Sequence, residues 1–258
     1  MDYLSCFKRY EIKYLLSRDQ YRAVTDAISG RVKPDEYGKS TICNIYYDTP
    51  DKRLIRRSLE DPVYKEKLRL RSYGIPSDSG RAFLEIKKKY DSVVYKRREA
   101  MTLRDALRFI DAPVPFSQIS SEIAYFIGYY SPLSPSVFLS YSREAFFGTT
   151  DPDLRITFDS DILWRDRDVR FDAGIGGSPI LQNGEVLMEV KIAGAMPLWL
   201  AGVMSDAGIR KTSFSKYGRA YMSILERSRR EKLCLTCLTA SLRRGRRRPL
   251  PSGNSSSV

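Results

Sequence analysis

Cationic side chains are concentrated on one face of a predicted β-strand at 64–73, YKEKLRLRSY. Side chains alternate between the two faces of a strand, so one face is partly apolar, with Glu66, Leu68 and Leu70. The other face is a row of cations: Lys65, Lys67, Arg69 and Arg71. Four like charges in a row repel one another, which is typical of a strand that binds a polyanion or opposes carboxylates. For this strand alone, a solvated outer face of a sheet is the simpler alternative.

The same alternation recurs along the chain. We predict about eight strands, and at least six of them carry charges on a single face. These strands are predicted at 7–16, 41–48, 64–73, 83–90, 93–99, 137–146, 154–159 and 186–192. Most of the charges that share a face are Lys or Arg, accompanied by a few carboxylates.

Amphipathic helices are predicted between the strands. Ser17 and Gln20 form a capping box for a helix that Gly30 ends, and Thr102 with Asp105 caps a second helix. Further helices are predicted at 121–130, at 197–208 and from about 214 to beyond 225. The segment 52–63, which carries Arg53, Arg56 and Arg57, is not assigned to a helix or a strand.

Composition excludes several classes of chemistry. The chain of 258 residues has no histidine, which excludes a histidine base, a histidine-activated nucleophile and a histidine-ligated metal. Its four cysteines do not suggest a disulfide scaffold, and the N-terminus lacks the apolar region of a secretion signal. The sequence contains no run of 18 or more apolar residues, which is the length needed to span a membrane. We therefore expect a reducing, cytoplasmic location.

The net charge of +13 is unevenly distributed. Nine of the 44 Lys and Arg residues, but only one of the 31 Asp and Glu residues, lie from Arg227 onward. We predict a folded domain at 1–226 and a basic, disordered tail at 227–258. Within that tail, Cys234 and Cys237 form a CxxC motif without a second pair, so we do not expect a zinc site.

A closed antiparallel barrel with a polar lumen explains the pattern better than an open sheet, because the predicted helices could cover an apolar outer face. A lumen rich in Lys and Arg requires compensating negative charge. A phosphate chain, bridged by metal to a few carboxylates, would supply that charge.

An ordered series of motifs resembles the VTC polyphosphate polymerase domain, a branch of the CYTH-like triphosphate tunnel metalloenzymes. The motifs are RYEIKY, NIYYDT, RLRSY, FLEIKKK, YKRR, YSREAF, RITFD, LMEVK and FSKYGR, and the resemblance covers about residues 6–226. The resemblance implies an α+β fold, with an eight-stranded antiparallel barrel forming a tunnel flanked by helices. It also implies transfer of the terminal phosphoryl group of ATP to a growing polyphosphate chain.

The resemblance also implies roles for individual residues. Glu189 would be the principal ligand of Mn²⁺ or Mg²⁺, with Glu11 and Glu85 as helpers. Arg69, Arg71, Lys87 and Glu189 would be catalytic. Phosphate or nucleotide would be bound by Lys13, Lys96, Arg143, Arg155, Lys191 and Lys216, the last of these at the start of the final helix.

Two positions depart from the family's pattern. The first strand carries Arg9-x-Glu11-x-Lys13 where hydrolase branches have Glu-x-Glu-x-Lys, so one metal-binding carboxylate is missing. This favours transfer to phosphate over hydrolysis, which needs an activated water. Ser213 replaces a basic residue that the family tends to have three positions before Lys216, and whether Lys211 substitutes for it is open.

Two other functions remain as alternatives. One is an inorganic or nucleoside triphosphatase of the same fold, and the other is a non-catalytic module that binds polyphosphate or RNA. Nucleic acid is disfavoured as a partner because no RNA-binding signature with stacked aromatics is present. The expected partners are ATP and inorganic polyphosphate. A membrane partner protein that receives the product and associates the chain with a membrane is left open.

Overall fold

The computed structural model describes residues 10–60, 63–91, 93–182 and 184–245, with side chains described as far as residue 232. By its contacts the chain divides into a first unit that ends at Ala220 and a second that begins at Tyr221. The first unit contains all the described strands: β1 Tyr10–Leu16, β2 Val32–Pro34, β3 Ser40–Asp48, β4 Tyr64–Tyr73, β5 Arg81–Tyr90, β6 Val93–Thr102, β7 Ser134–Gly148, β8 Arg155–Arg165, β9 Ser178–Pro179 and β10 Val186–Ile192.

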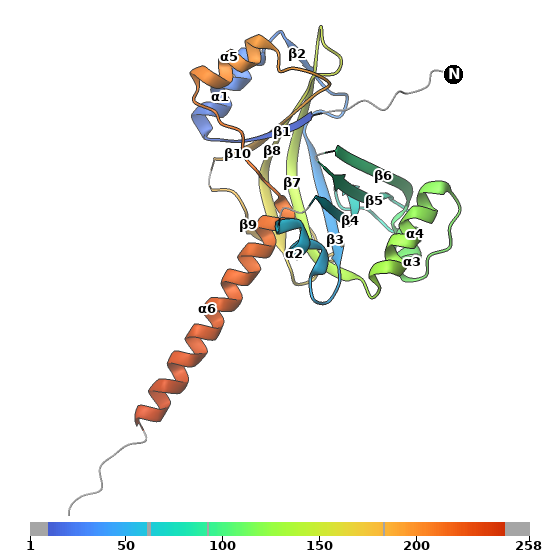
Figure 1. The fold of residues 1–258 in the computed structure, drawn as a ribbon, viewed down its shortest axis with the longest axis vertical. Helices are drawn as coiled ribbons and strands as arrows, with labels where there is room; N and C mark the ends of the chain where they lie inside the picture. Colours follow the sequence, from blue (N-terminus) through green and yellow to red (C-terminus); the bar gives the residue numbers. More distant parts are fainter. Residues whose placement is uncertain (1–9, 61–62, 92, 183, 246–258) are drawn as a thin grey trace, which may run out of the picture. The chain divides into compact units, whose positions relative to one another are not determined.

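Eight of these strands form one continuous antiparallel path, in the order β1-β10-β8-β7-β3-β4-β5-β6 (Figure 1). The short strands β2 and β9 pair with β7 and β8 beside this path. The prediction of an eight-stranded antiparallel sheet is therefore confirmed. The predicted closure of the sheet into a barrel needs a correction. The path ends at β1 and β6, and within the described residues no backbone pairing joins these two strands. Side chains approach one another across the open side of the sheet, where Lys87 of β5 lies 3.5 Å from Glu11 of β1.

The described residues form six helices: α1 Arg18–Ile28, α2 Arg53–Leu59, α3 Leu103–Asp111, α4 Gln118–Tyr130, α5 Leu198–Asp206 and α6 Lys216–Gly245. Two apolar clusters lie between helices and strands. One joins α3 and α4 to the outer faces of β3, β4, β5 and β7, and the other joins α1 and α5 to β1, β8 and β10. Figure 1 shows the same two groups of helices on different sides of the sheet. An apolar outer face covered by helices is thus confirmed.

Two helix starts follow the sequence signals. Ser17 Oγ accepts the Gln20 N–H while the Gln20 side chain accepts the Ser17 N–H, and Thr102 Oγ1 accepts the Asp105 N–H. These bonds satisfy amide groups that the first turn leaves without helical partners, and at Ser17 they are reciprocal. Both caps therefore bear out the prediction.

The unassigned segment forms α2, and its first turn is capped from outside the helix. Asp48, at the end of β3, accepts the N–H groups of Leu54 and Ile55 through its two carboxylate oxygens. The same carboxylate accepts the hydroxyl of Tyr217 at 2.7 Å, which ties the start of α6 to β3. A carboxylate at a helix N-terminus is stabilised by the helix dipole as well as by these bonds.

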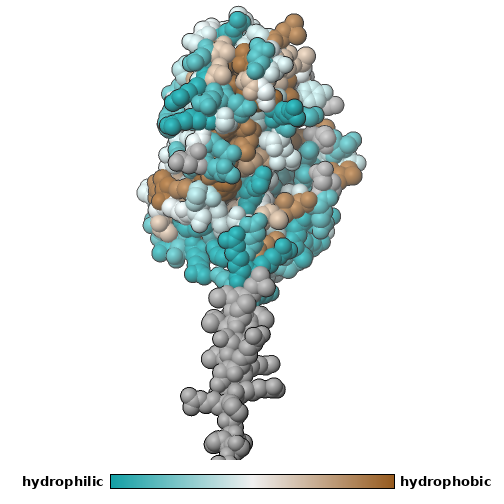
Figure 2. All heavy atoms as spheres, turned by 90° about the vertical axis from the view of Figure 1, so that its left-hand side faces the viewer, coloured by the Kyte–Doolittle hydropathy of each residue, from teal (hydrophilic) through white to brown (hydrophobic). Residues whose placement is uncertain are grey.

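The surface of the first unit is mostly hydrophilic on the face drawn in Figure 2, with apolar side chains scattered across it. Within the described residues, no helix is long and apolar enough to cross a membrane. In the second unit the backbone is helical as far as Gly245, which includes the first part of the predicted basic tail. Residues 246–258 of that tail, and the side chains of Cys234 and Cys237, lie outside the described residues.

A candidate active site in the cationic lumen

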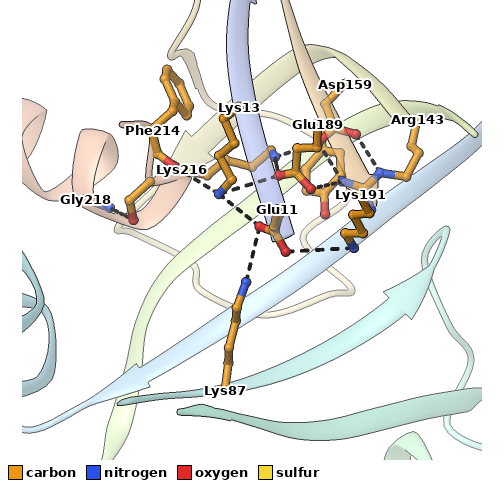
Figure 3. Close-up of polar contacts among 12 residues, drawn as sticks. Glu11, Lys13, Lys87, Arg143, Asp159, Glu189, Lys191, Phe214, Lys216 and Gly218 are labelled. Carbon is orange, nitrogen blue, oxygen red and sulfur yellow. Dashed lines mark hydrogen bonds and ion pairs between the residues drawn. The ribbon is translucent and has the colours of Figure 1, made fainter. Parts of the chain in front are cut away.

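The charged and polar faces of the main strands converge on one another. We call the space between these faces the lumen. Contacts between strands that are not paired show the convergence: the Arg71 guanidinium of β4 donates to the Tyr141 hydroxyl of β7 at 3.0 Å, and Lys87 of β5 approaches Glu11 of β1. Figure 3 shows Lys87 extending from its strand toward the group around Glu11 and Glu189. Predicted site residues from distant parts of the sequence therefore meet in one place.

Glu189 lies at the centre of the most crowded cluster. Its carboxylate is 3.6 Å from Lys13, 3.7 Å from Lys216 and 3.8 Å from Arg143, and the residue is almost fully buried. Burial by itself would raise the pKa of Glu189, but Lys216, Lys13 and Arg143 outweigh it and hold that pKa well below its usual range. Glu189 is therefore an anion at neutral pH.

Asp159 belongs to this cluster, although the sequence analysis did not select it. The fully buried carboxylate accepts two N–H groups of Arg143, at 2.6 and 2.7 Å, and the Lys216 ammonium at 2.5 Å (Figure 3). Burial opposes ionisation of Asp159, yet Lys216 and Arg143 lower its pKa. The signal that could have identified Asp159 is its place on the same face of β8 as Arg155. We infer that Asp159 positions the two cations beside Glu189.

Glu85 anchors a second cluster. Its carboxylate accepts Arg69 Nε at 2.6 Å, Arg98 Nε at 2.5 Å and Lys96 Nζ at 2.9 Å. Burial raises its pKa, but Arg69 and other cations outweigh burial and depress it strongly. Three cations thus occupy the oxygens of Glu85, which was predicted as a helper for the metal. This geometry favours Glu85 as the group that orients Arg69, and its metal role stays a prediction.

Arg71 is held in a different way from Arg69. Its guanidinium donates to Asn44 Oδ1 and to the Tyr141 hydroxyl, both at 3.0 Å and both uncharged. The side chain is buried, and within the described residues no carboxylate pairs with it. Burial and the nearby Arg69 lower the pKa of Arg71. A buried cation with only neutral partners is well suited to an anionic ligand.

Glu11 connects three lysines from different strands. It lies 3.4 Å from Lys13, 3.5 Å from Lys87 and 3.9 Å from Lys191. Burial raises the pKa of Glu11, but Lys87, Lys13 and Lys191 outweigh it, so the net shift is downward. Glu11 and Glu189 also share Lys13, which brings the two carboxylates to one region of the lumen (Figure 3).

Arg155 lies at the margin of the predicted set. Its guanidinium is 3.9 Å from Asp35 and stacks 4.9 Å from the centre of the Phe147 ring. Its Nε is buried without a hydrogen-bond partner. A phosphate contact by Arg155 therefore stays a prediction.

The lumen residues fit a divalent cation chemically. Within the described residues, no group of three acidic or sulfur side chains is placed to hold a metal. Glu189 and Glu11 nevertheless offer the hard oxygen ligands that Mg²⁺ and Mn²⁺ prefer, and the remaining ligands can come from phosphate and water. Thr157 lies directly across the strand pair from Glu189, and its buried hydroxyl has no hydrogen-bond partner. A polar ligand bound beside Glu189 would give this buried hydroxyl a hydrogen-bond partner.

Lys216 begins α6, and Lys211 lies apart from it. The Lys216 ammonium packs 4.5 Å from the centre of the Tyr141 ring in addition to its carboxylate contacts. Lys211 forms an isolated backbone bridge with Tyr14, and its side chain is exposed. Whether Lys211 replaces the basic residue missing at Ser213 stays open.

The lumen lysines predict an unusual dependence of stability on pH. Burial is the main reason that the pKa of Lys67 falls to about 7 and that of Lys96 to about 8, against an ordinary lysine pKa of 10.5. Between the lowered pKa values and 10.5, these lysines bind more protons in the unfolded chain than in the folded chain. Raising the pH in this range therefore favours folding. We expect the urea midpoint of the ligand-free protein at low salt to rise from about pH 6.5 to about pH 9. A flat or falling midpoint in this range would contradict the lowered lysine pKa values.

Comparisons with known proteins agree with this geometry. The fold is similar to that of a proposed adenylyl cyclase from Hippeastrum that is described as having a dominant triphosphatase activity, with a TM-score of 0.52 and 17% identity over 81% of this chain and 94% of that chain. It is also similar to a proposed adenylate cyclase from Bacillus halodurans, with a TM-score of 0.50 and 13% identity over 81% of this chain and 95% of that chain. At these identities the likeness shows a common fold.

No match was found among curated proteins. The VTC domain family model, in contrast, matches residues 8–225, which include every predicted site residue. The match therefore covers the sheet, the lumen and the start of α6, and the resemblance drawn from the motifs is confirmed. The chain belongs to the VTC domain family.

Proposed function

We propose that this chain is a metal-dependent polyphosphate polymerase, which transfers the γ-phosphoryl group of ATP to the end of an inorganic polyphosphate chain held in the lumen. The observation that carries the proposal is the excess of inward-facing cations over carboxylates. Four carboxylates, Glu11, Glu85, Asp159 and Glu189, face a larger set of cations: Lys13, Lys67, Arg69, Arg71, Lys87, Lys96, Arg98, Arg143, Arg155, Lys191 and Lys216. Such a lumen requires a polyanion to balance it.

The arrangement suits phosphoryl transfer, in which positioning and charge neutralisation supply most of the catalysis. Arg69 is oriented by Glu85, and Arg71 is oriented by Asn44 and Tyr141, so both guanidiniums are preorganised to hold the transferring group. On the other side of the lumen, Asp159 positions Arg143 and Lys216 to neutralise charge on neighbouring phosphates.

In this proposal Glu189 is the principal ligand for Mg²⁺ or Mn²⁺, with Glu11 as the second carboxylate. The cation would supply charge neutralisation of the nucleotide triphosphate. Lys13, Lys87 and Lys191 would bind phosphate oxygens once their contacts with Glu11 are shared with the ligand.

The absence of histidine and the substitution at Arg9 favour transfer over hydrolysis. Hydrolysis needs a water activated by a base or by a well-ligated metal. The end of a phosphate chain is already anionic and needs positioning rather than deprotonation.

The test is to incubate the purified protein with ATP and Mn²⁺ and to follow phosphorus by NMR. We expect an internal-phosphate resonance to grow together with ADP. Orthophosphate without that resonance would replace this proposal with a triphosphatase of the same fold. Unchanged ATP, with polyphosphate binding that falls steeply with salt and needs no metal, would replace it with a binding module.

A further inference from the structure

Three lysines form a row across neighbouring strands of the lumen. Lys67 of β4 lies directly opposite Lys87 of β5, and Lys87 lies directly opposite Lys96 of β6. Like charges at directly opposed positions of a sheet destabilise it. The row is therefore maintained at a cost in the ligand-free protein.

Lys67 differs from the other two lysines in its partners. Lys96 pairs with Glu85 at 2.9 Å and Lys87 pairs with Glu11 at 3.5 Å. Within the described residues, no carboxylate pairs with Lys67, and its ammonium donates only to the Ser215 hydroxyl, at 3.0 Å. Lys67 is partly buried, and the neutral oxygen of Ser215 is its one hydrogen-bond partner among the described residues.

Ser215 immediately precedes α6 and links Lys67 to the N-terminus of that helix. Its Oγ accepts the Gly218 N–H at 3.1 Å as well as the Lys67 ammonium. A serine hydroxyl has two acceptor sites and one donor, so both acceptor sites are used and the O–H remains a donor. Two N–H groups of Lys67 also remain. These donors and the positive end of the helix dipole are complementary to an anion.

The groups around Lys67 are mainly cationic. Lys65 and Arg69 share its strand, Lys87 faces it from β5, and Lys13 faces it from β1. The carboxylate nearest in the register of β3, Asp48, is already engaged by backbone N–H groups of α2 and by the Tyr217 hydroxyl. Glu11 is shared by the other lysines, as described above. Among the residues that the structure describes, no neighbouring acid is therefore free to neutralise Lys67.

We propose that Lys67 and Ser215 form a subsite for a non-reacting phosphate group of a linear inorganic polyphosphate. This inference rests on the proposed function, because it names how the same lumen holds its polyanion. The subsite uses a charge-assisted contact from Lys67 and a hydroxyl contact from Ser215. Lys67 is thus a binding residue for the chain rather than one that handles the transferring group.

The protonation of Lys67 gives this proposal a distinctive readout. Burial, followed by Lys87 and Lys13, lowers the pKa of Lys67 to about 7, so a large fraction of its amines is neutral at pH 8. A phosphate bound beside it favours the charged form and raises that pKa. Binding must then draw a proton from the solvent.

The test is metal-free calorimetric titration of inorganic tripolyphosphate at pH 8, in buffers with different ionisation enthalpies, to count the protons taken up. In the Lys67→Met variant we expect affinity to fall about tenfold. We also expect its proton count to fall below the wild-type count by about 0.5 to 1 per ligand, because the titrating amine is removed. Lys88→Met is the matched control, since it removes one cation from the outer face of β5.

A Lys67→Arg variant separates charge from titration. Arginine remains charged at all accessible pH values, so we expect it to retain most of the affinity while losing the extra proton uptake. Wild-type affinity and wild-type proton count in Lys67→Met would overturn the proposal. If Lys67→Met does not fold, the Lys67→Arg proton count alone decides: an unchanged count overturns the proposal. Neither ATP nor turnover is involved, so a failed polymerase assay leaves this test intact.

Discussion

Replacing Glu189 with Gln is expected to lower phosphoryl-transfer turnover at least about 10²-fold while leaving the protein folded. Gln retains the shape of the side chain but removes the negative charge that three cations now surround. Its neutral amide is a poor ligand for a divalent cation. Asp159 still pairs with Arg143 and Lys216, so we expect the fold to remain. Initial rates at increasing Mn²⁺ concentration measure the effect.

The control for this change is Glu144→Gln. Glu144 adjoins Arg143 on β7 but faces the other side of the sheet, where it lies 3.9 Å from Lys39. We expect Glu144→Gln to keep the wild-type rate and metal dependence. A Glu189→Gln variant with wild-type turnover and an unchanged response to Mn²⁺ would remove Glu189 from the metal site.

Replacing Asp159 with Asn is expected to have the largest effect on stability. The fully buried carboxylate of Asp159 is bound by both Arg143 and Lys216, so the change leaves two buried cations without their anion. Removing one partner of a buried ion pair typically costs about 3–5 kcal/mol. Urea unfolding at pH 7 should show a loss of this size in the free energy of unfolding.

Tripolyphosphate should recover part of that loss, because a bound anion compensates the same two cations. Asp161→Asn is the matched control, since Asp161 is an exposed residue of the same strand with a positive φ of 51° that Asn tolerates. Equal urea midpoints for Asp159→Asn and the wild type would show that Asp159 does not hold the cations together.

Much of the fold could be predicted from local patterns. Two-residue alternation identified the charged faces that form the lumen, and the caps at Ser17 and Thr102 marked two helix starts. These features depend on neighbouring residues in the sequence, so they can be read without the structure. Helix α2 was not predicted because its first turn is capped by Asp48 from another element, while Lys52 before it has a left-handed backbone and no side-chain cap.

The candidate site was predictable as a set of residue types but not as a set of contacts. Alternation placed Glu85 and Glu189 on lumen faces, yet it could not show that Glu85 would be surrounded by Arg69, Arg98 and Lys96. Such contacts depend on strand order and register, which join segments far apart in the chain. The importance of Asp159 and the isolation of Lys67 from carboxylates became visible only when these partners were in place.

The central claim is that the γ-phosphoryl group of ATP enters a polymer in the lumen. The most direct measurement uses ATP labelled at the γ-phosphorus with Mn²⁺, followed by separation of the products by size. We predict that the label enters chains that lengthen with time and that the Glu189→Gln variant forms none. Label recovered only as orthophosphate, with no labelled chain at any time, would contradict the claim.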